Sequence, residues 1–557
     1  MTEWRTGDQR IIERAAWSFV WLAITTLGVN DWGQWSQWPG MGVVTPLVVL
    51  VGIVGGSLVW SLDDPTSSTM TYVSLGAAAL VVALSEGAAI ATRPFYTTDS
   101  AAFNQVATEL LLHGKNPYTS SFAGAAQLLS YPSQYWTYTL NGGHVAQMSY
   151  PAGSFLVQAP LMALGVHHLA TDWLDLAAWL ATAALLFLLV PRSLRWLAPL
   201  LLLTDAFLGP LSNGGTDALF IPFLVVAMWR WDRFVGARRY SLAAWLSPVA
   251  LGLACSIKQS PWFCVPFVLV GIALEARSAQ VGALRTATRY ALITGAVFTL
   301  INLPFFIWSP AAWLRGTLRP LLDPLVPDGQ GLVTLALHGL TGGVDLRGLF
   351  VAGALAGVAL LAALGVWYSQ LKRTWLFLLP LVLFVPGRSL TNYLLDFVPA
   401  ALIAALSVQR AARSVPGPGR AWVRRLAVAA PLGGAVLIAA VAFRSAPLVV
   451  RIDSVATSHA GQTFSSITLS VHNQSDQPVT PRFMITSGGG HPNGFWIATS
   501  PAGAARLAPG ATASVTIRPS TWTWVPHRAD YWLVDAYTTS PAALSTSQPR
   551  RWPYGHL

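Results

Sequence analysis

Charged side chains are scarce in this sequence. Asp, Glu, Lys and Arg make up 10% of its 557 residues, whereas an ordinary soluble domain contains about 25% of them. Hydrophobic residues account for 54% of the chain. So few charges cannot cover the surface of a soluble protein of this size. The composition therefore excludes an ordinary water-soluble enzyme and indicates a protein whose main solvent is lipid.

Cysteine is nearly absent. The two cysteines, Cys255 and Cys264, lie in apolar stretches, and their spacing matches no metal-ligand motif. A disulfide framework and a cysteine-bound metal cluster therefore have no support in the sequence. We expect both side chains to pack in the interior.

Long apolar runs take up most of the chain. Segments near the ~20 residues that cross a bilayer recur from residue 17 to residue 444. The first run follows three arginines, as in a signal peptide, but no small-residue cleavage site comes after it, so we interpret it as a retained span. Thirteen candidate spans result: 17–37, 42–61, 71–92, 173–190, 197–212, 216–231, 242–257, 261–275, 290–308, 347–369, 374–386, 389–408 and 424–444.

The basic residues gather in the connections between spans. A net charge of +11 often indicates nucleic-acid binding, but orientation explains it better here, because cytoplasmic loops of membrane proteins are rich in Lys and Arg. With thirteen spans and a cytoplasmic N-terminus, every basic loop is cytoplasmic: 191–195, 230–239, 277–289, 371–373 and 410–425. The loops 93–150 and 309–346 and the residues after 445 are then extracytoplasmic. Segment 151–168 must be re-entrant or interfacial to keep this parity.

The C-terminal segment has a different character. Charges, Ser and Thr become more frequent after about residue 447, and alternating stretches such as "SSITLSVHN" and "ATASVTIRP" indicate strands. "LAPGATASVTI" resembles the late hairpin of immunoglobulin-like modules. We therefore predict an all-α polytopic plasma-membrane protein with a C-terminal all-β, immunoglobulin-like sandwich. Its parts are an N-terminal transmembrane hairpin (1–66), a transmembrane catalytic domain (67–445) and an extracytoplasmic β-domain (446–557).

An acidic residue marks the start of the first large loop. Asp99 stands where the chain leaves the third span, before a helix that places Phe103, Val106, Leu110 and Leu111 on one apolar side. Gly114 ends this helix, and a turn at residues 116–118 follows. We expect a carboxylate at the membrane surface beside an amphipathic helix that lies along it.

These segments resemble the GT-C superfamily, the membrane glycosyltransferases that use polyprenyl-phosphate sugars, and most of all its bacterial mannosyltransferase-like branch. The likeness covers roughly residues 70–410, and the order of the motifs carries it. The motifs are Asp99 itself, "AFNQVATELLLHGKNPY", "SYPAGSF" at 149–155, "NGGTDALFIPFLV" at 213–225, "GLACSIKQSPWF" at 252–263 and "RSLTNYLLDFVP" at 388–399.

The resemblance implies an inverting transfer of a sugar, with mannose the first expectation, from a polyprenyl phosphate to a cell-envelope glycan or glycolipid. Asp99 corresponds to the family's catalytic acid and would act as the general base. The departing phosphate needs positive charge, for which Lys258 and Arg388 are the leading candidates and Arg93 the third. Arg93 could instead lower the pKa of Asp99. The β-domain is expected to hold the acceptor.

Four further residues are candidate substrate contacts. They are Tyr118 in the turn, His144 and His338 on the extracytoplasmic loops, and Asp217 in "NGGTD". No cofactor is certain, although Asp217 could bind a divalent ion, and Asp205 lies unexplained inside an apolar run.

Each candidate also has a purely structural interpretation. Asp99 and Asp217 could be helix N-caps, and Lys258 and Arg388 could be anchors that extend toward water at helix ends. The histidines could be exposed or packed. Trp32, Trp35 and Trp38 suit an interfacial belt, and Trp522, Trp524 and Trp532 are expected in the core of the β-domain rather than on sugar rings.

Two other functions compete with the enzyme. A polytopic fold with a few buried charges also suits a transporter or flippase of lipid-linked sugars, although the sequence has no inverted repeat of the kind that transporters often show. A non-catalytic envelope assembly protein could use the β-domain to bind partners. Replacing Asp99 with Asn separates these possibilities.

Overall fold

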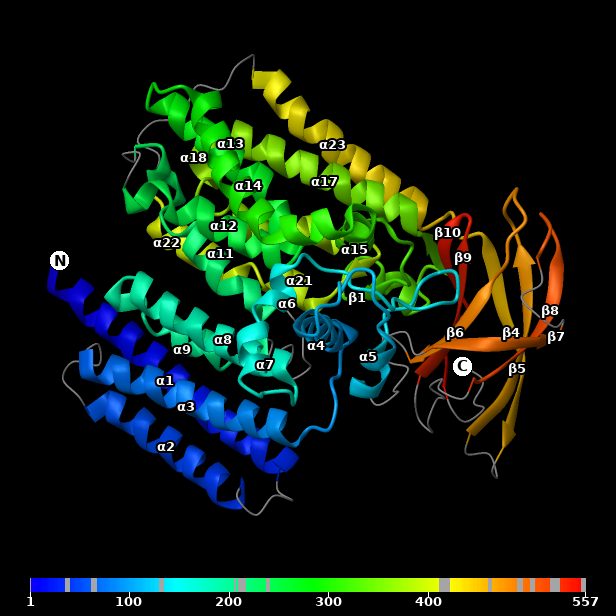
Figure 1. Cartoon of the computed structure of the whole chain (residues 1–557), viewed down its shortest axis with the longest axis horizontal. Helices are drawn as coiled ribbons and strands as arrows, with labels where there is room; N and C mark the ends of the chain where they lie inside the picture. Colours follow the sequence, from blue (N-terminus) through cyan, green and yellow to red (C-terminus); the bar gives the residue numbers. More distant parts are fainter. Residues whose placement is uncertain are drawn as a thin grey trace.

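We describe a computed structural model of the chain. The described residues are 2–35, 41–61, 68–129, 135–204, 207–208, 217–236, 241–409, 421–458, 463–487, 494–500, 506–520 and 531–551. The helices form one bundle, and the C-terminal strands form a β-rich region at one end of it (Figure 1).

The long helices account for most of the bundle. Their bounds are α1 Thr2–Trp35, α2 Met41–Ser61, α3 Ser68–Thr92, α4 Asp99–Leu112, α8 Ala170–Leu189, α12 Leu246–Ile257, α13 Cys264–Ser278, α14 Ala283–Trp308, α15 Pro310–Leu322, α17 Leu346–Val366, α22 Val398–Ser407 and α23 Ala421–Ala442.

Short helices connect them, and several are broken by proline or by 3₁₀ turns. They are α5 Ala123–Leu128, α6 Gly153–Leu156, α7 Ala159–Ala163, η2 Arg192–Leu194, α9 Leu197–Leu202, η3 Ala218–Phe220, α11 Ile221–Met228, η4 Trp231–Phe234, η5 Leu242–Ala244, η6 Ser260–Phe263, α16 Thr334–Leu337, α18 Tyr368–Leu371, α19 Trp375–Leu378, α20 Pro380–Phe384 and α21 Thr391–Leu395.

Seven described helices are long and apolar enough to cross a membrane. They cover Val43–Ser61, Thr69–Thr92, Ala170–Leu189, Ser260–Ser278, Ala283–Trp308, Leu346–Val366 and Arg425–Ala442. Five shorter apolar helices lie among them: Gly153–Ala163, Ala218–Met228, Leu246–Ile257, Trp375–Phe384 and Thr391–Ser407. The prediction of a helix-rich chain with several helices able to cross a membrane is therefore confirmed, whereas the count of thirteen spans stays a prediction.

One predicted span and the predicted re-entrant segment are both made of short helical pieces. The described part of 197–212 contains the six-residue α9 and a short helical piece at 207–208. Segment 151–168, expected to be re-entrant or interfacial, forms the broken pair α6 and α7, in which Phe155 is fully buried. Asp205 lies outside the described residues.

The N-terminal hairpin packs through glycine. A Cβ on Gly55 of α2 would lie 2.2 Å from the Trp21 ring of α1, and one on Gly52 would lie 2.2 Å from Thr25 Oγ1. Small residues allow this close approach, which gives helices in lipid their van der Waals contact. Trp21 is buried in consequence.

The two cysteines lie inside the bundle. Cys255 and Cys264 are both buried free thiols, as expected from the apolar sequence around them. Of the tryptophans assigned to the membrane belt, Trp32 and Trp35 lie in α1, but their side chains, like Trp38, lie outside the described residues.

The C-terminal strands form a single curled sheet. Their bounds are β4 Leu448–Ser458, β5 Thr463–Asn473, β6 Arg482–Ser487, β7 Phe495–Ser500, β8 Thr512–Arg518, β9 Tyr531–Thr539, β10 Ala542–Thr546 and β11 Arg550–Arg551. With β2 (Gly343–Asp345) included, the strand order is β2-β10-β9-β6-β7-β8-β5-β4, with β11 paired to β9. The sheet encloses an apolar core that includes Ile467, Ile517 and Trp532. Core burial of Trp532 is thus confirmed, and Trp522 and Trp524 lie outside the described residues.

One strand of this sheet comes from outside the C-terminal segment. β2 (Gly343–Asp345), immediately before α17, pairs antiparallel with β10. It covers the edge of β10, which would otherwise present free backbone groups. The β-rich region is therefore joined to the bundle by hydrogen bonds as well as by the chain, a connection that the sequence did not predict. An immunoglobulin-like sandwich is not confirmed.

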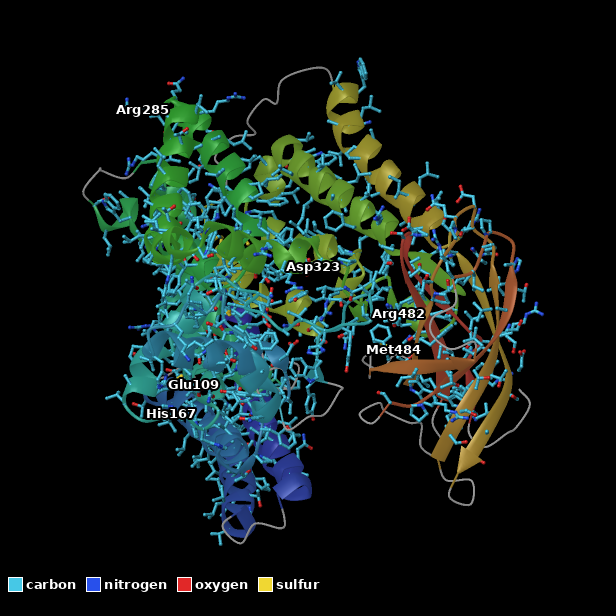
Figure 2. The ribbon with its side chains drawn as sticks, turned by 45° about the vertical axis from the view of Figure 1, so that its right-hand side comes forward. Glu109, His167, Arg285, Asp323, Arg482 and Met484 are labelled. Atoms are coloured by element: carbon cyan, nitrogen blue, oxygen red, sulfur yellow. The ribbon has the colours of Figure 1, made fainter. Side chains whose placement is uncertain are left out.

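A third core joins the β-rich region to the loops of the bundle. Tyr138 from the 93–150 loop, Val333 from the 309–346 loop and Met484 from β6 are buried in the same cluster. Figure 2 labels Met484 on the side of the β-rich region that faces the bundle. The two large loops and the C-terminal region therefore meet at one end of the bundle, whereas Arg285 lies at the opposite end (Figure 2).

Candidate active site

Asp99 begins α4 with a buried carboxylate. The N-cap is Thr98, whose hydroxyl accepts from Ala101 N at 3.4 Å, so the interpretation of Asp99 as the capping residue is wrong. Asp99 is 8% exposed, and its Oδ2 accepts from the backbone N–H of Thr137 at 2.8 Å. The side chain thus ties the start of α4 to a strand-like segment of the same loop.

Helix α4 is more enclosed than a surface helix. Phe103 and Val106 are buried, as the apolar pattern predicts, but the polar residues between them are buried too. Gln105 donates to His167 O at 2.8 Å, and the Thr108 hydroxyl donates to Phe155 O at 2.9 Å. These bonds hold the polar side of α4 against the neighbouring segments, so α4 is enclosed by protein, and its predicted position along the membrane surface stays a prediction.

Burial raises the pKa of the Asp99 carboxyl above its ordinary value. Removal from water disfavours the charged form. The N–H of Thr137 and the guanidinium of Arg388 act in the opposite direction and favour the carboxylate. Arg388, rather than Arg93, is therefore the cation that lowers the pKa of Asp99.

Lys258 lies at the end of α12 and is buried at 5% exposure. Its ammonium forms an ion pair with Asp217, whose other carboxylate oxygen accepts from the amide of Asn392. Asp217 occupies the N-cap position of η3 but makes no capping hydrogen bond there. The interpretation of Lys258 as an anchor that extends toward water is therefore wrong, and so is that of Asp217 as a helix cap.

Two tyrosine rings flank the Lys258 ammonium. Its Nζ lies 5.6 Å from the ring centroid of Tyr150 and 5.6 Å from that of Tyr393. Cations within about 6 Å of a ring face are attracted to it. Tyr150 also lies within electrostatic range of Asp99, and Tyr393 within range of Arg388. The rings therefore connect the Lys258 pair to the Asp99 and Arg388 groups.

Two further carboxylates complete this polar cluster. Asp175 on α8 and Asp396, which follows α21, are buried and interact electrostatically with both Asp217 and Lys258. Among the described residues, neither oxygen of Asp175 and only one oxygen of Asp396 has a hydrogen-bond partner. Such intramembrane acids are costly, so they tend to serve a function.

Arg388 is held by a short parallel bridge. β3 (Arg388–Ser389) pairs in parallel with β1 (Asp328–Gly329). Gly329 has a φ of +109°, and its Cα lies against the backbone oxygen of Ser389. A Cβ there would lie 2.2 Å from that oxygen, so only glycine fits. The guanidinium lies 4.0 Å from Asp328 and donates to Val326 O at 3.3 Å, and 21% of the side chain is exposed. Arg388 therefore keeps donors free for a ligand.

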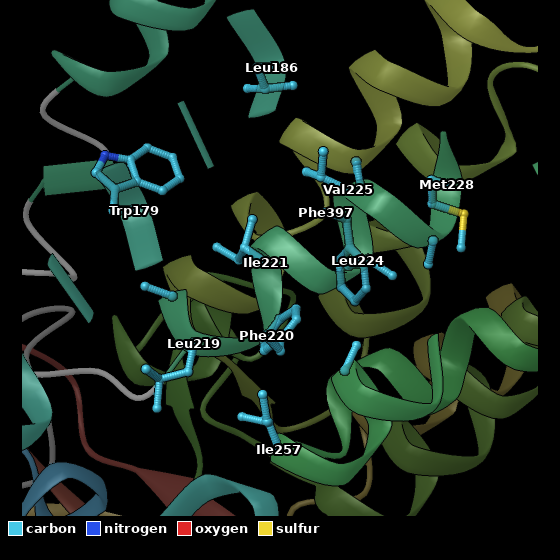
Figure 3. Close-up of a cluster of buried hydrophobic side chains, with 14 of the residues drawn as sticks. Trp179, Leu186, Leu219, Phe220, Ile221, Leu224, Val225, Met228, Ile257 and Phe397 are labelled. Atoms are coloured by element: carbon cyan, nitrogen blue, oxygen red, sulfur yellow. The ribbon is translucent and has the colours of Figure 1, made fainter. Parts of the chain in front are cut away.

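The apolar core holds the Asp217 segment against the end of α12. Leu219, Phe220 and Ile221 pack near Ile257, the residue before Lys258 (Figure 3). This packing lets a short 3₁₀ turn place Asp217 against a lysine that is 41 residues away in the sequence.

His144 lies beside Asp99 at the exposed rim. Its ring is 4.4 Å from that of Trp136, and it is exposed. Partial burial lowers the pKa of His144, while the Asp99 carboxylate raises it. The imidazole is thus a neutral partner near pH 7 and can contact a ligand bound at Asp99.

Three predicted site residues lie elsewhere. Arg93 forms an ion pair with the buried Asp172 of α8. The Tyr118 hydroxyl donates to Tyr150 O at 2.7 Å, and its ring packs against Phe155, so it supports the site from the interior. His338 is exposed on α16, which contacts the β-rich region, and its Nδ1 lies 3.0 Å from Thr334 O.

The described residues contain no group of three or more His, Cys, Asp or Glu side chains arranged to hold a metal. The suggestion of a divalent ion at Asp217 therefore gains no support from its neighbours, because the ammonium of Lys258 occupies the cation's place beside that carboxylate.

Sequence reasoning missed five members of the cluster: Tyr150, Asp175, Asn392, Tyr393 and Asp396. Four of them lie inside the quoted motifs "SYPAGSF" and "RSLTNYLLDFVP", and Asn392 and Asp396 are four residues apart, which places them on one side of a helical turn. That spacing was the available signal. Asp175 follows Asp172 by one turn of α8 and could have been found in the same way.

The cluster thus joins the buried Asp99, the partly exposed Arg388 and Lys258. Lys258 is paired with Asp217, and two further carboxylates lie near this pair. Comparison with known proteins adds no name to this arrangement: no protein-family model, no curated protein and no solved structure matches the chain.

Proposed function

We propose that this chain is a membrane-embedded glycosyltransferase that moves a sugar, with mannose the first candidate, from a polyprenyl phosphate to a cell-envelope glycan or glycolipid. The observation that carries the proposal is the buried Asp99 carboxylate, which has one backbone donor from Thr137 and lies within electrostatic range of Arg388. A general base and a phosphate-binding cation are the two groups that such a transfer needs.

Asp99 is suited to take the acceptor proton. Its raised pKa makes the carboxylate a stronger base than an exposed aspartate, and general-base help of this kind contributes about 10²- to 10⁴-fold to the rate. The acceptor hydroxyl oxygen attacks the anomeric carbon from the side opposite the phosphate. Its proton passes to Asp99, the carbon–oxygen bond to the phosphate breaks, and the phosphate keeps the electron pair.

Arg388 is the better candidate for the donor phosphate. Lys258 is already neutralised by Asp217, whereas the ion pair of Arg388 with Asp328 is long, at 4.0 Å, among the described residues. A guanidinium also binds phosphate through two nitrogens. In this proposal Lys258 stabilises the site through its ion pair with Asp217 and its contacts with the flanking tyrosine rings. Arg93 does not contact the donor.

The proposed orientation places this chemistry on the extracytoplasmic side. Its support is that both large loops meet the β-rich region at one end of the bundle, whereas Arg285, from a basic connection, lies at the other end. The positive-inside rule assigns the Arg285 end to the cytoplasm. His144 and Trp136 at the exposed rim are then the candidates for contact with the acceptor.

The test is transfer by the purified full-length protein. It is incubated with a panel of radiolabelled polyprenyl-phosphate sugars and envelope lipid extract, beside the variants Asp99→Asn and Asp323→Asn. Asp323 lies on the loop after α15 and pairs with Arg319, so its replacement is the control. We expect one label to move with wild type and Asp323→Asn but not with Asp99→Asn. Failure of every donor contradicts the enzyme.

A transporter of lipid-linked sugars is the second candidate. The observation in its favour is Asp175, a buried acid on a membrane-crossing helix with no hydrogen-bond partner among the described residues, as proton-coupled transporters use. Flux of a labelled lipid-linked sugar across proteoliposomes that persists in Asp99→Asn and stops in Asp175→Asn would favour this function.

A further inference from the structure

A large groove lies in the β-rich region, away from the Asp99 cluster. Its volume is about 1180 Å³, and its walls come from β4 on one side and from β9, β10 and β11 on the other. β4 stands at one end of the strand order, so its outer edge pairs with no other described strand, and the groove lies along this edge. No member of the candidate active site lines the groove.

The rim of the groove is strongly basic. Arg444, Arg451, Arg550 and Arg551 line it, and Asp453 is the one acidic residue among the described residues of its wall. All four arginines are exposed, and within the described part of the chain none forms an ion pair. Four guanidinium groups against one carboxylate attract an anion, and guanidinium binds phosphate oxygens in pairs.

Two buried polar side chains also belong to the wall of the groove. Trp532 is 3% exposed and Thr546 is 5% exposed, and both line the groove. Neither the indole nitrogen of Trp532 nor the hydroxyl of Thr546 has a hydrogen-bond partner among the described residues. Both atoms are themselves covered by protein, so the four exposed arginines carry the attraction for an anion.

The groove opens at the membrane end of the β-rich region. Thr341 and Gly342 in its wall come just before α17, and Phe443 and Arg444 come just after α23. The last turns of α23 expose Leu437 and Val441, which are lipid-facing in a helix of this kind. An anionic group in this groove is therefore at the height of lipid headgroups.

From these observations we propose that the groove binds the phosphate headgroup of an anionic membrane lipid. The arginines hold the phosphate, and the acyl chains lie along α23. A sugar polymer fits less well, because Phe464 and Trp532 in the wall are each 3% exposed and offer no ring face for stacking.

The first test is lipid retention by the full-length protein. It is reconstituted in nanodiscs with equal phosphatidylglycerol and phosphatidylcholine, extracted, and examined by native mass spectrometry. Wild type should retain phosphatidylglycerol preferentially. The double variant Arg451→Gln/Arg551→Gln should lose this preference by at least about tenfold, since each surface arginine contributes a factor of several to anionic lipid binding.

Arg518→Gln is the matched control, because Arg518 is an exposed arginine on β8 that does not line the groove. It should retain the lipid as wild type does. Equal retention of the two lipids by wild type, or an unchanged preference in the double variant, overturns the proposal.

The second test needs no substitution and therefore does not depend on the folding of a variant. A photoactivatable phosphatidylglycerol is crosslinked to wild type in the same nanodiscs, and the labelled peptides are mapped. Labelling should concentrate in residues 444–453 and 546–551. Labelling spread over the bundle alone, or displacement of the lipid from these peptides by a soluble anionic oligosaccharide at lower concentration, contradicts a lipid site.

Discussion

Arg388 is the residue whose replacement separates phosphate binding from folding. It is partly exposed and loosely paired, so Arg388→Gln should fold, yet it removes the charge that stabilises the departing phosphate. We expect turnover to fall by roughly 10²-fold or more, with a smaller change in KM. Arg388→Lys should recover part of the loss, because it restores the charge without the paired nitrogens. Steady-state kinetics of the two variants measure this, and equal turnover in wild type and Arg388→Gln would remove Arg388 from the mechanism.

Lys258 is the residue whose replacement should damage the fold. Lys258→Met leaves Asp217 buried beside Asp175 and Asp396 with no cation, and breaking one side of a buried pair costs about 3–5 kcal/mol. The double variant Lys258→Met/Asp217→Asn removes both charges and should regain much of this stability. Thermal unfolding in detergent distinguishes them. A single variant as stable as wild type would show that the pair contributes little.

The sequence could identify those residues of the site whose side chains are charged, because charges are rare in this chain. Asp99, Lys258 and Arg388 stand out because charges are costly beside apolar sequence, and they do lie in one cluster. His338 was chosen for its place on an extracytoplasmic loop, but β2 draws this loop toward the β-rich region. Tyr150 and Tyr393 carry no charge, and only tertiary packing brings their rings to Lys258.

At the scale of elements, α6 depends on a glycine. A Cβ on Gly153 would lie 2.5 Å from the backbone oxygen of Ser256, near the end of α12 and close to Lys258. Gly153→Ala should therefore push α6 away, lower the melting temperature and reduce turnover, as overpacking costs about 1–3 kcal/mol. Gly295→Ala on α14 is the control, since no atom lies within 4 Å of its added Cβ. Equal melting temperatures for the two variants would contradict this packing.

The elements themselves were predictable where they are long. A run such as that of α17 is long enough to cross a bilayer and contains no proline, so its apolar length determines its structure. The short pieces around α9, α11 and α19 were not resolved from the sequence. Apolar length alone does not show where prolines such as Pro222 and Pro380 divide a helix, or which pieces are buried in protein.

At the scale of the whole molecule, one buried acid makes the β-rich region sensitive to pH. Burial raises the pKa of Asp535 to about 7, although Thr486 and Tyr537 donate hydrogen bonds to it. The folded state then holds a proton that the unfolded chain releases above its ordinary pKa near 3.9, so stability falls as pH rises from about 4 to about 7 and is level above that.

Asp535→Asn should remove this dependence, because the amide keeps the shape and does not ionise. Unfolding of the full-length protein, followed by the fluorescence of tryptophans such as Trp496 and Trp532, should show a midpoint that decreases between pH 4 and pH 7 in wild type and changes less in the variant. Parallel curves for both proteins would contradict a raised pKa at Asp535.

The organisation of the whole molecule was only partly predictable. The change in composition near residue 447 predicts the strands, because the alternation of apolar and polar residues with a period of two is a local property of the sequence. The pairing of β2 with β10 joins residues about two hundred positions apart, and no local pattern in a three-residue strand signals it. A still longer separation in the sequence hides the shared core of Tyr138 and Met484.

The central claim is that Asp99 acts as the general base, and the rate of sugar transfer as a function of pH tests it most directly. A base must be ionised to act, and burial raises the pKa of Asp99, so the wild-type rate should rise with pH through a midpoint above the ordinary value of 3.8. Asp99→Asn should be slower by about 10²- to 10⁴-fold and should lose this limb. A variant that keeps the wild-type rate and the same pH dependence would contradict the account.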